Sequence, residues 1–137
     1  MLYRFIRIFS IIFRLAIMGG YVLLLGMVVF NGDLNDFGGG ENYTLFNTIK
    51  RYPVGSEGFL LNVVGNIVMF VPFGFFVGYY FGRGGILKLL ISLVLIVGVP
   101  VGIEFAQLQM GRVFDVDDIL LNAVGGVAGY LFCITFR

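Results

Sequence analysis

Histidine is absent from this chain, and cysteine occurs once, at Cys133. Without histidine the chain lacks the usual general base near neutral pH and the commonest ligand of transition metals. A single cysteine excludes intramolecular disulfides and cysteine-based metal sites. Serine is also scarce, at Ser10, Ser56 and Ser92. None of these lies near the acidic cluster described below, which argues against covalent catalysis by a serine nucleophile.

Charged residues are also few. They make up 12% of the 137 residues, whereas hydrophobic residues make up 59%, and the mean hydropathy is +1.00. This mixture, with 21 glycines, is typical of an integral membrane protein and not of a soluble domain. The net charge is only +1, and the basic residues are scattered without the interleaved aromatics of a nucleic-acid surface. We therefore expect a membrane protein that does not bind nucleic acid.

Four apolar runs are long enough to cross a bilayer, at residues 8–30, 59–81, 86 to about 106, and 119–136. As a helix, the first would rise about 35 Å, slightly more than the hydrocarbon thickness. Pro72 interrupts the second run and Pro100 the third, and each should kink its helix by leaving a carbonyl without its usual donor. The sequence therefore predicts an all-α integral membrane protein with a single domain, residues 1–137, four transmembrane helices, and kinks in the second and third.

The basic residues predict how these helices are oriented. They mark the N-terminus, the second loop and the C-terminus, at Arg4, Arg7, Arg83, Lys88 and Arg137. The first and third loops hold most of the acids, although Lys50, Arg51 and Arg112 go against the trend. Because arginine and lysine accumulate on the cytoplasmic side, we expect both termini in the cytoplasm. The loops of residues 31–58 and 108–117 should then lie outside.

Polar side chains that are costly in a membrane concentrate between residues 104 and 122. Many recur at spacings of three or four residues, which places them on shared helical faces. With one asparagine from the second span, the cluster consists of Glu104, Gln107, Arg112, Asp115, Asp118, Asn122 and Asn66. The predicted topology brings these groups, from three helices, to the outer part of the spans. We therefore predict one outward-facing polar site.

The long polar loop of residues 31–58 has two interpretations. Residues 43–52 mix apolar and basic side chains, which favours a short amphipathic piece lying at the membrane interface. A plain solvated loop is the alternative. At the other polar segment, Asp117 is interpreted as a solvated or helix N-terminal charge.

Glycines recur every four residues in three of the spans. They lie at Gly74, Gly78 and Gly82, at Gly98 and Gly102, and at Gly125 and Gly129. Small residues at this spacing let neighbouring helices approach closely. The pattern predicts three ridges for helix packing.

Several motifs occur along the chain: Asn-Ile-Val-Met-Phe-Val-Pro-Phe-Gly at residues 66–74, then Glu104-x-x-Gln107, Arg112, Asp115-x-x-Asp118-x-x-x-Asn122 and a glycine-rich final helix. Together they resemble the VanZ-like family of small bacterial membrane proteins. Leu-Phe-Asn-Thr-Ile at residues 45–49 is similar to the first-loop motif of that family, without its usual proline. The resemblance covers most of residues 43–130. It implies a multi-pass protein of the bacterial cell membrane, related to one that lowers susceptibility to the glycopeptide antibiotic teicoplanin.

The polar cluster has a structural and a functional interpretation. Ion pairs among Glu104, Arg112 and Asp118, and hydrogen bonds from the asparagines, would merely lock the helices together. The cluster has more polar groups than two such pairs require, which favours a site. In the functional interpretation, the catalytic residues are Glu104, Asp118 and Asp115, and the substrate-binding residues are Asn66, Gln107, Arg112 and Asn122. The metal, the cofactor and the oligomeric state are left open, although the acids suit a hard divalent ion.

The resulting expectation is a role in cell-envelope modification or resistance to teicoplanin-type antibiotics. The partners would be membrane lipid and a lipid-linked cell-wall intermediate or a lipoglycopeptide. Whether the protein is an enzyme stays open, and a non-enzymatic protein that shields the cell-wall target is the alternative. A small transporter is a weaker alternative, because the inner halves of the second and fourth helices are apolar.

Overall fold

The computed structural model describes residues 2–31 and 41–137. The structure divides into two compact units, Met1–Asp33 and Leu34–Arg137. Four helical stretches of the described residues are long and apolar enough to cross a membrane, at Tyr3–Phe30, Glu57–Phe81, Gly85–Gln109 and Val116–Phe136. The predicted four spans are thus confirmed. Their union into one domain, and the side of the membrane on which each end lies, stay predictions.

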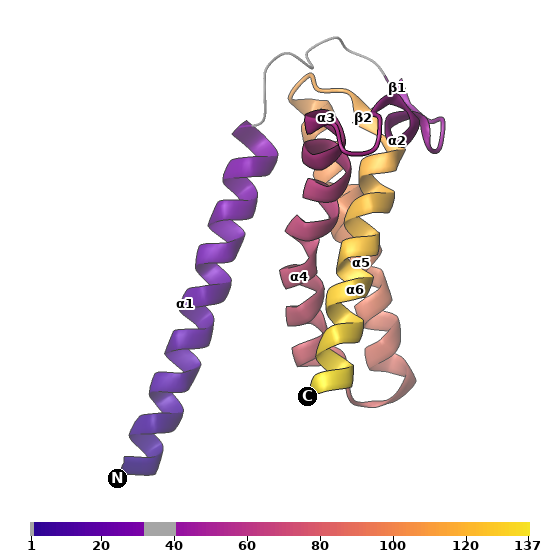
Figure 1. Ribbon diagram of the computed structural model, residues 1–137. Helices are drawn as coiled ribbons and strands as arrows, with labels where there is room; N and C mark the ends of the chain where they lie inside the picture. Colours follow the sequence, from indigo (N-terminus) through magenta and orange to yellow (C-terminus); the bar gives the residue numbers. More distant parts are fainter. Residues whose placement is uncertain (1, 32–40) are drawn as a thin grey trace. The chain divides into compact units, whose positions relative to one another are not determined.

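The first unit is a single helix, α1 (Leu2–Asn31) (Figure 1). Arg14 is the one charged residue in the middle of this apolar helix, and its guanidinium donates hydrogen bonds to a residue of the same helix. The Arg14 Nε donates to the carbonyl oxygen of Ser10 at 3.0 Å, and the terminal nitrogen donates to the Ser10 hydroxyl at 2.9 Å. These bonds offset part of the cost of a guanidinium in apolar surroundings.

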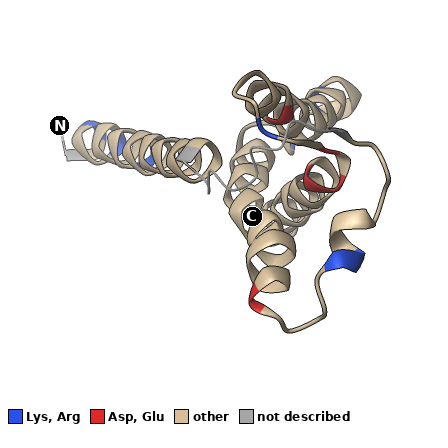
Figure 2. Cartoon of the chain, turned by 90° about the horizontal axis from the view of Figure 1, so that it is seen from above, with Lys and Arg blue, Asp and Glu red and all other residues tan. Residues whose placement is uncertain are grey.

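The second unit holds three long helical segments. The second span is built from α3 (Glu57–Phe59), a π-helical turn η2 (Leu60–Val64) and α4 (Gly65–Phe81). It is followed by α5 (Gly85–Gln109) and α6 (Val116–Phe136). Seen from above, only a few segments of the ribbon are acidic or basic (Figure 2). The apolar core of the unit takes one side chain from each long helix: Val77 from α4, Ile96 from α5 and Tyr130 from α6.

The irregular backbone of the second span lies in η2, ahead of Pro72. A π-turn widens the helix, and its displaced carbonyls need other donors. The side-chain amide of Asn62 donates to the carbonyl oxygen of Gly58, and that of Asn66 donates to the carbonyl oxygen of Asn62, both at 2.9 Å. Helices α4 and α5 run through Pro72 and Pro100. The predicted kinks at these two prolines stay predictions.

Glycines bring α4 and α6 into backbone contact. A Cβ atom at Gly74 would overlap the backbone of Gly126, and one at Gly125 would overlap the carbonyl oxygen of Ile67. Close approach of this kind is the expected use of small residues in membrane helices. Gly98 and Gly102 on α5 behave differently, because a Cβ there would meet no atom of the described residues within 4 Å. The predicted ridge on α5 is therefore not used inside the second unit.

The end of this unit where α6 begins carries all the short elements (Figure 1). Strand β1 (Glu41–Asn42) pairs in parallel with β2 (Phe114–Asp115), which leads directly into α6. The short helix α2 (Asn47–Arg51) follows β1. The first loop is therefore anchored on the segment between α5 and α6, and the interpretation of residues 43–52 as a plain solvated loop is wrong. Its placement at a membrane interface stays a prediction.

Candidate functional site

The turn after α5 is determined by how that helix ends. Gly111 has φ of 82°, a left-handed conformation that favours glycine after a helix. The backbone N–H of Arg112 then donates to the carbonyl oxygen of Gln107 at 3.1 Å. This turn gives the carbonyl oxygen of Gln107, at the end of α5, a hydrogen-bond donor. It also places Arg112 at the end of the helices, where its side chain lines the cavity described below.

Asp115 joins the first loop to the start of α6. Its Oδ1 accepts the N–H of Asp117 at 2.9 Å, which satisfies one of the free donors in the first turn of α6. The same oxygen accepts the side-chain amide of Asn42 at 3.0 Å, and Oδ2 accepts the hydroxyl of Thr48. A residue predicted to be catalytic therefore also holds two segments of the first loop.

Asp117 is fully buried, with 0% of its surface exposed. Its carboxylate accepts the backbone N–H of Phe46 at 2.6 Å and that of Thr48 at 2.7 Å. Phe46 has φ of 66°, which a bulky residue rarely adopts, so these bonds stabilise a strained start of α2. The position of Asp117 in the first turn of α6 is confirmed. The expectation of a solvated charge is wrong, because loop amides replace water.

Glu104 lies near the end of α5 and is only 2% exposed. Its Oε2 accepts the backbone N–H of Asp115 at 3.0 Å. The carboxylate thus fixes β2 against α5, which is a structural role. A catalytic role for Glu104 stays a prediction.

Asp118 connects α6 to the second span. Its Oδ1 accepts the side-chain amide of Asn66 at 2.8 Å, and the same amide donates to the carbonyl oxygen of Asn62. Two of the predicted site residues, far apart in the chain, are therefore in direct contact. The convergence predicted for Asn66 and Asp118 is present in the structure.

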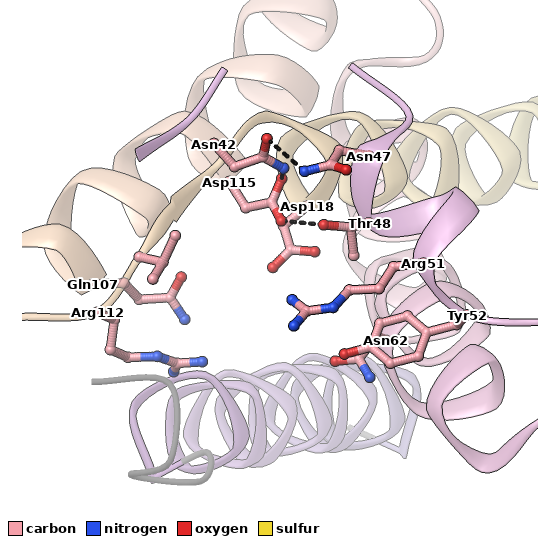
Figure 3. Close-up of a pocket in the computed structure, with 11 residues that line it drawn as sticks. Asn42, Asn47, Thr48, Arg51, Tyr52, Asn62, Gln107, Arg112, Asp115 and Asp118 are labelled. Carbon is pink, nitrogen blue, oxygen red and sulfur yellow. Dashed lines mark hydrogen bonds between the residues drawn. The ribbon is translucent and has the colours of Figure 1, made fainter. Parts of the chain in front are cut away.

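A polar cavity of about 140 Å³ opens beside these contacts (Figure 3). Its walls come from the first loop, the start of the second span, the end of α5 and the start of α6. The lining residues are Asn42, Asn47, Thr48, Arg51, Tyr52, Asn62, Gln107, Arg112, Val113, Asp115 and Asp118. Figure 3 shows the side chains of Arg51 and Arg112 extending into the space from opposite sides, with the Asp118 carboxylate on a third side, next to the Arg51 guanidinium in this view.

Four of the seven predicted site residues line this cavity, namely Gln107, Arg112, Asp115 and Asp118. Asn66 and Glu104 lie behind the wall, where they hold Asp118 and Asp115 in place. Asn122 is buried on α6, 4% exposed, and its side-chain oxygen has no hydrogen-bond partner among the described residues. Such an orphaned acceptor is costly in a low-dielectric interior.

Sequence reasoning missed the contribution of the first loop, and above all Arg51. The one signal that pointed there was the resemblance of residues 45–49 to a family motif. Asn62 was visible as a polar residue in an apolar span, one helical turn before Asn66. Nothing in the loop sequence indicated that α2 docks on α6, because that contact depends on Asp117 and backbone amides.

The described residues contain no group of three or more acidic or cysteine side chains placed to hold a metal ion. The cavity combines two guanidinium groups and two carboxylates with carboxamides and hydroxyls. These groups can bind an anion, donate to carbonyl oxygens and accept from hydroxyls.

The chain was compared with known proteins. Comparisons with curated proteins and with solved structures returned no match. A family model described as VanZ/LLP1 matches residues 8–137, which include all four spans except the first turns of α1. This agrees with the resemblance drawn from the motifs of the second, third and fourth spans. The chain therefore belongs to the VanZ/LLP1 family.

Proposed function

We propose that this protein binds an amphiphilic component of the cell envelope in its polar cavity, and that this underlies envelope modification or resistance to teicoplanin-type glycopeptides. The observation that carries the proposal is the cavity itself. It gathers polar side chains from four segments at one end of apolar helices. Polar groups in a membrane protein are costly, and their concentration at one cavity supports binding.

The position of the cavity supports an amphiphile as ligand. It lies where the spans end and the polar loop begins, so a headgroup can enter it while apolar chains remain along the helices. The excess of basic residues at the opposite helix ends supports an outward-facing cavity. Envelope intermediates and lipoglycopeptides meet the membrane on that side.

Two mechanisms are compatible with this binding. Asp118 faces the cavity and is suited to act as an acid or base. The alternative is a protein that only shields its ligand, and two contacts favour it: Asp115 and Glu104 already accept donors from the protein. A purified preparation that converts a labelled envelope precursor would establish an enzyme. Retained binding without conversion would establish shielding.

The decisive experiment measures resistance to a teicoplanin-type antibiotic in a host that depends on this protein for it. Asp118→Asn keeps the side-chain volume but replaces the carboxyl group that faces the cavity with an amide. We expect resistance to fall to the level of the deletion strain, at equal amounts of protein in the membrane. Glu57→Gln is the matched control, because Glu57 is exposed and lies outside the cavity. Full resistance in the Asp118 variant would reject the proposal.

A further inference from the structure

We infer that the cavity binds a phosphate group that carries a neighbouring hydroxyl, as in a glycerophosphate or sugar-phosphate headgroup, held between Arg51 and Arg112. This inference rests on the proposed function, because it names the chemistry of the ligand that enters the cavity. It assigns a binding role to Arg51, which lies in a loop outside the predicted cluster.

Both arginines are held by the backbone that carries them. Arg51 is the last residue of α2, whose start is fixed by the Asp117 carboxylate through the N–H groups of Phe46 and Thr48. Arg112 follows the glycine turn that closes α5. The two guanidinium groups therefore approach one space from two separately anchored elements (Figure 3). The backbone that carries each arginine is therefore in place before a ligand binds, and only the two side chains lose conformational freedom on binding.

Two arginines on opposite sides favour phosphate over carboxylate. A carboxylate has two oxygens in one plane, and a single guanidinium fork already binds both of them. A phosphate presents its oxygens in a tetrahedral arrangement, so it can accept from two forks that approach from different directions. A volume of about 140 Å³ holds a small headgroup but not a whole amphiphile.

The acids of the cavity distinguish among phosphate ligands. Asp115 already accepts donors on both oxygens, from Asn42, Thr48 and the backbone of Asp117. Asp118 accepts the amide of Asn66 on Oδ1, and its Oδ2 has no hydrogen bond within the described part of the chain. An oxygen of this kind can accept a hydroxyl, and the amides of Asn62 and Gln107 also line the cavity. The ligand should therefore carry a hydroxyl near its phosphate.

A lipid is the source that the position of the cavity favours, because the cavity lies at the ends of membrane-spanning helices. Binding of labelled phosphatidylglycerol to the purified full chain in neutral detergent micelles tests this. Phosphatidylethanol has the same phosphodiester charge without the hydroxyls, and we expect it to bind several-fold more weakly. Competition by inorganic phosphate at concentrations as low as those of the lipid would assign the site to a soluble ion and overturn the lipid assignment.

Variants test the arginines directly. We expect Arg51→Gln and Arg112→Gln each to weaken phosphatidylglycerol binding about tenfold or more. Lys50→Gln is the matched control, since Lys50 is exposed on the same short helix, outside the cavity, and loses the same charge. We expect it to bind like the wild type. Equal losses in the Lys50 and Arg51 variants would show general surface attraction and reject the inference.

The test of phosphate binding can fail without the test of the proposed function failing, and the reverse is also true. Arg51 is exposed and has no hydrogen bond or ion pair to a described residue, so its replacement should not disturb folding, even if Arg112→Gln lowers the melting temperature. Unchanged lipid binding in Arg51→Gln, with resistance lost in Asp118→Asn, would reject this inference alone. Arginine-dependent lipid binding without any effect on resistance would reject the proposed function alone.

Discussion

At the scale of single residues, the carboxylates of this protein have different tasks. Asp117 and Glu104 accept backbone N–H groups and are almost completely buried. Asp115 caps a helix and binds the first loop. Of these four acids, Asp118 alone both contacts another span and presents an oxygen to the cavity. Glu104 and the three aspartates of residues 115–118 thus divide into supports and a candidate for ligand contact.

The buried Asp117 should be essential for the stability of the loop. Asp117→Asn keeps the shape but places an amide donor against one of two backbone donors, from Phe46 or Thr48. We expect the free energy of unfolding to fall by about 2 kcal/mol, the usual cost of losing a hydrogen bond to a buried charge. Thermal melting in detergent measures this, with Glu57→Gln as the control. A melting temperature equal to that of the wild type would contradict the assigned contacts.

Asn122 leads to the opposite expectation. Its side-chain oxygen is buried without a partner among the described residues, so Asn122→Leu removes an unsatisfied group. We expect the free energy of unfolding to equal that of the wild type or to exceed it by up to about 1 kcal/mol, with an equal or higher melting temperature. Lipid binding should be unchanged, because Asn122 does not line the cavity. A loss of binding would instead support the substrate-binding role predicted from the sequence.

At the scale of elements, the same residue type has two uses. The glycines of α4 and α6 let the two backbones touch, whereas Gly98 and Gly102 of α5 face open space within the described structure. Spacing alone predicted all of these ridges equally, because a glycine pattern does not reveal whether a partner helix is present.

Alanine substitutions distinguish the two sets of glycines. Gly125→Ala places a methyl group against the carbonyl oxygen of Ile67, and we expect a loss of about 1 to 3 kcal/mol in stability from overpacking. Gly98→Ala meets no atom within 4 Å and should be neutral or stabilise the helix by up to about 1 kcal/mol. Melting of the two purified variants in one detergent gives the comparison. Equal effects would mean that α4 and α6 are not in contact.

At the scale of the whole molecule, the chain is a multi-pass membrane protein of the VanZ/LLP1 family with its polar elements at one end of the second unit. The side of the membrane that this end faces is a prediction from the basic residues. An envelope ligand of the proposed kind requires the first loop to lie outside.

Labelling of introduced cysteines tests this topology in a Cys133→Ser background. Val54 in the first loop is 87% exposed, and Arg83 lies in the turn between α4 and α5. We expect an impermeant thiol reagent to modify Val54→Cys on intact cells, and to modify Arg83→Cys only after the membrane is permeabilised. The reverse pattern would invert the topology and place the cavity in the cytoplasm.

Composition and spacing alone determined that this chain belongs in a membrane, how many spans it has, and that its polar groups gather near residues 104 to 122. These features follow from hydrophobic runs and helical periodicity, which are local properties of a sequence. The tertiary structure alone decided that Arg51 lies opposite Arg112, and that Glu104 supports Asp115 behind the cavity wall. The physical reason is that the hydrogen-bond donors in contact with a carboxylate decide whether it supports the fold or is available to a ligand. Here those donors are backbone N–H groups and side chains brought together by long-range contacts that no local pattern encodes.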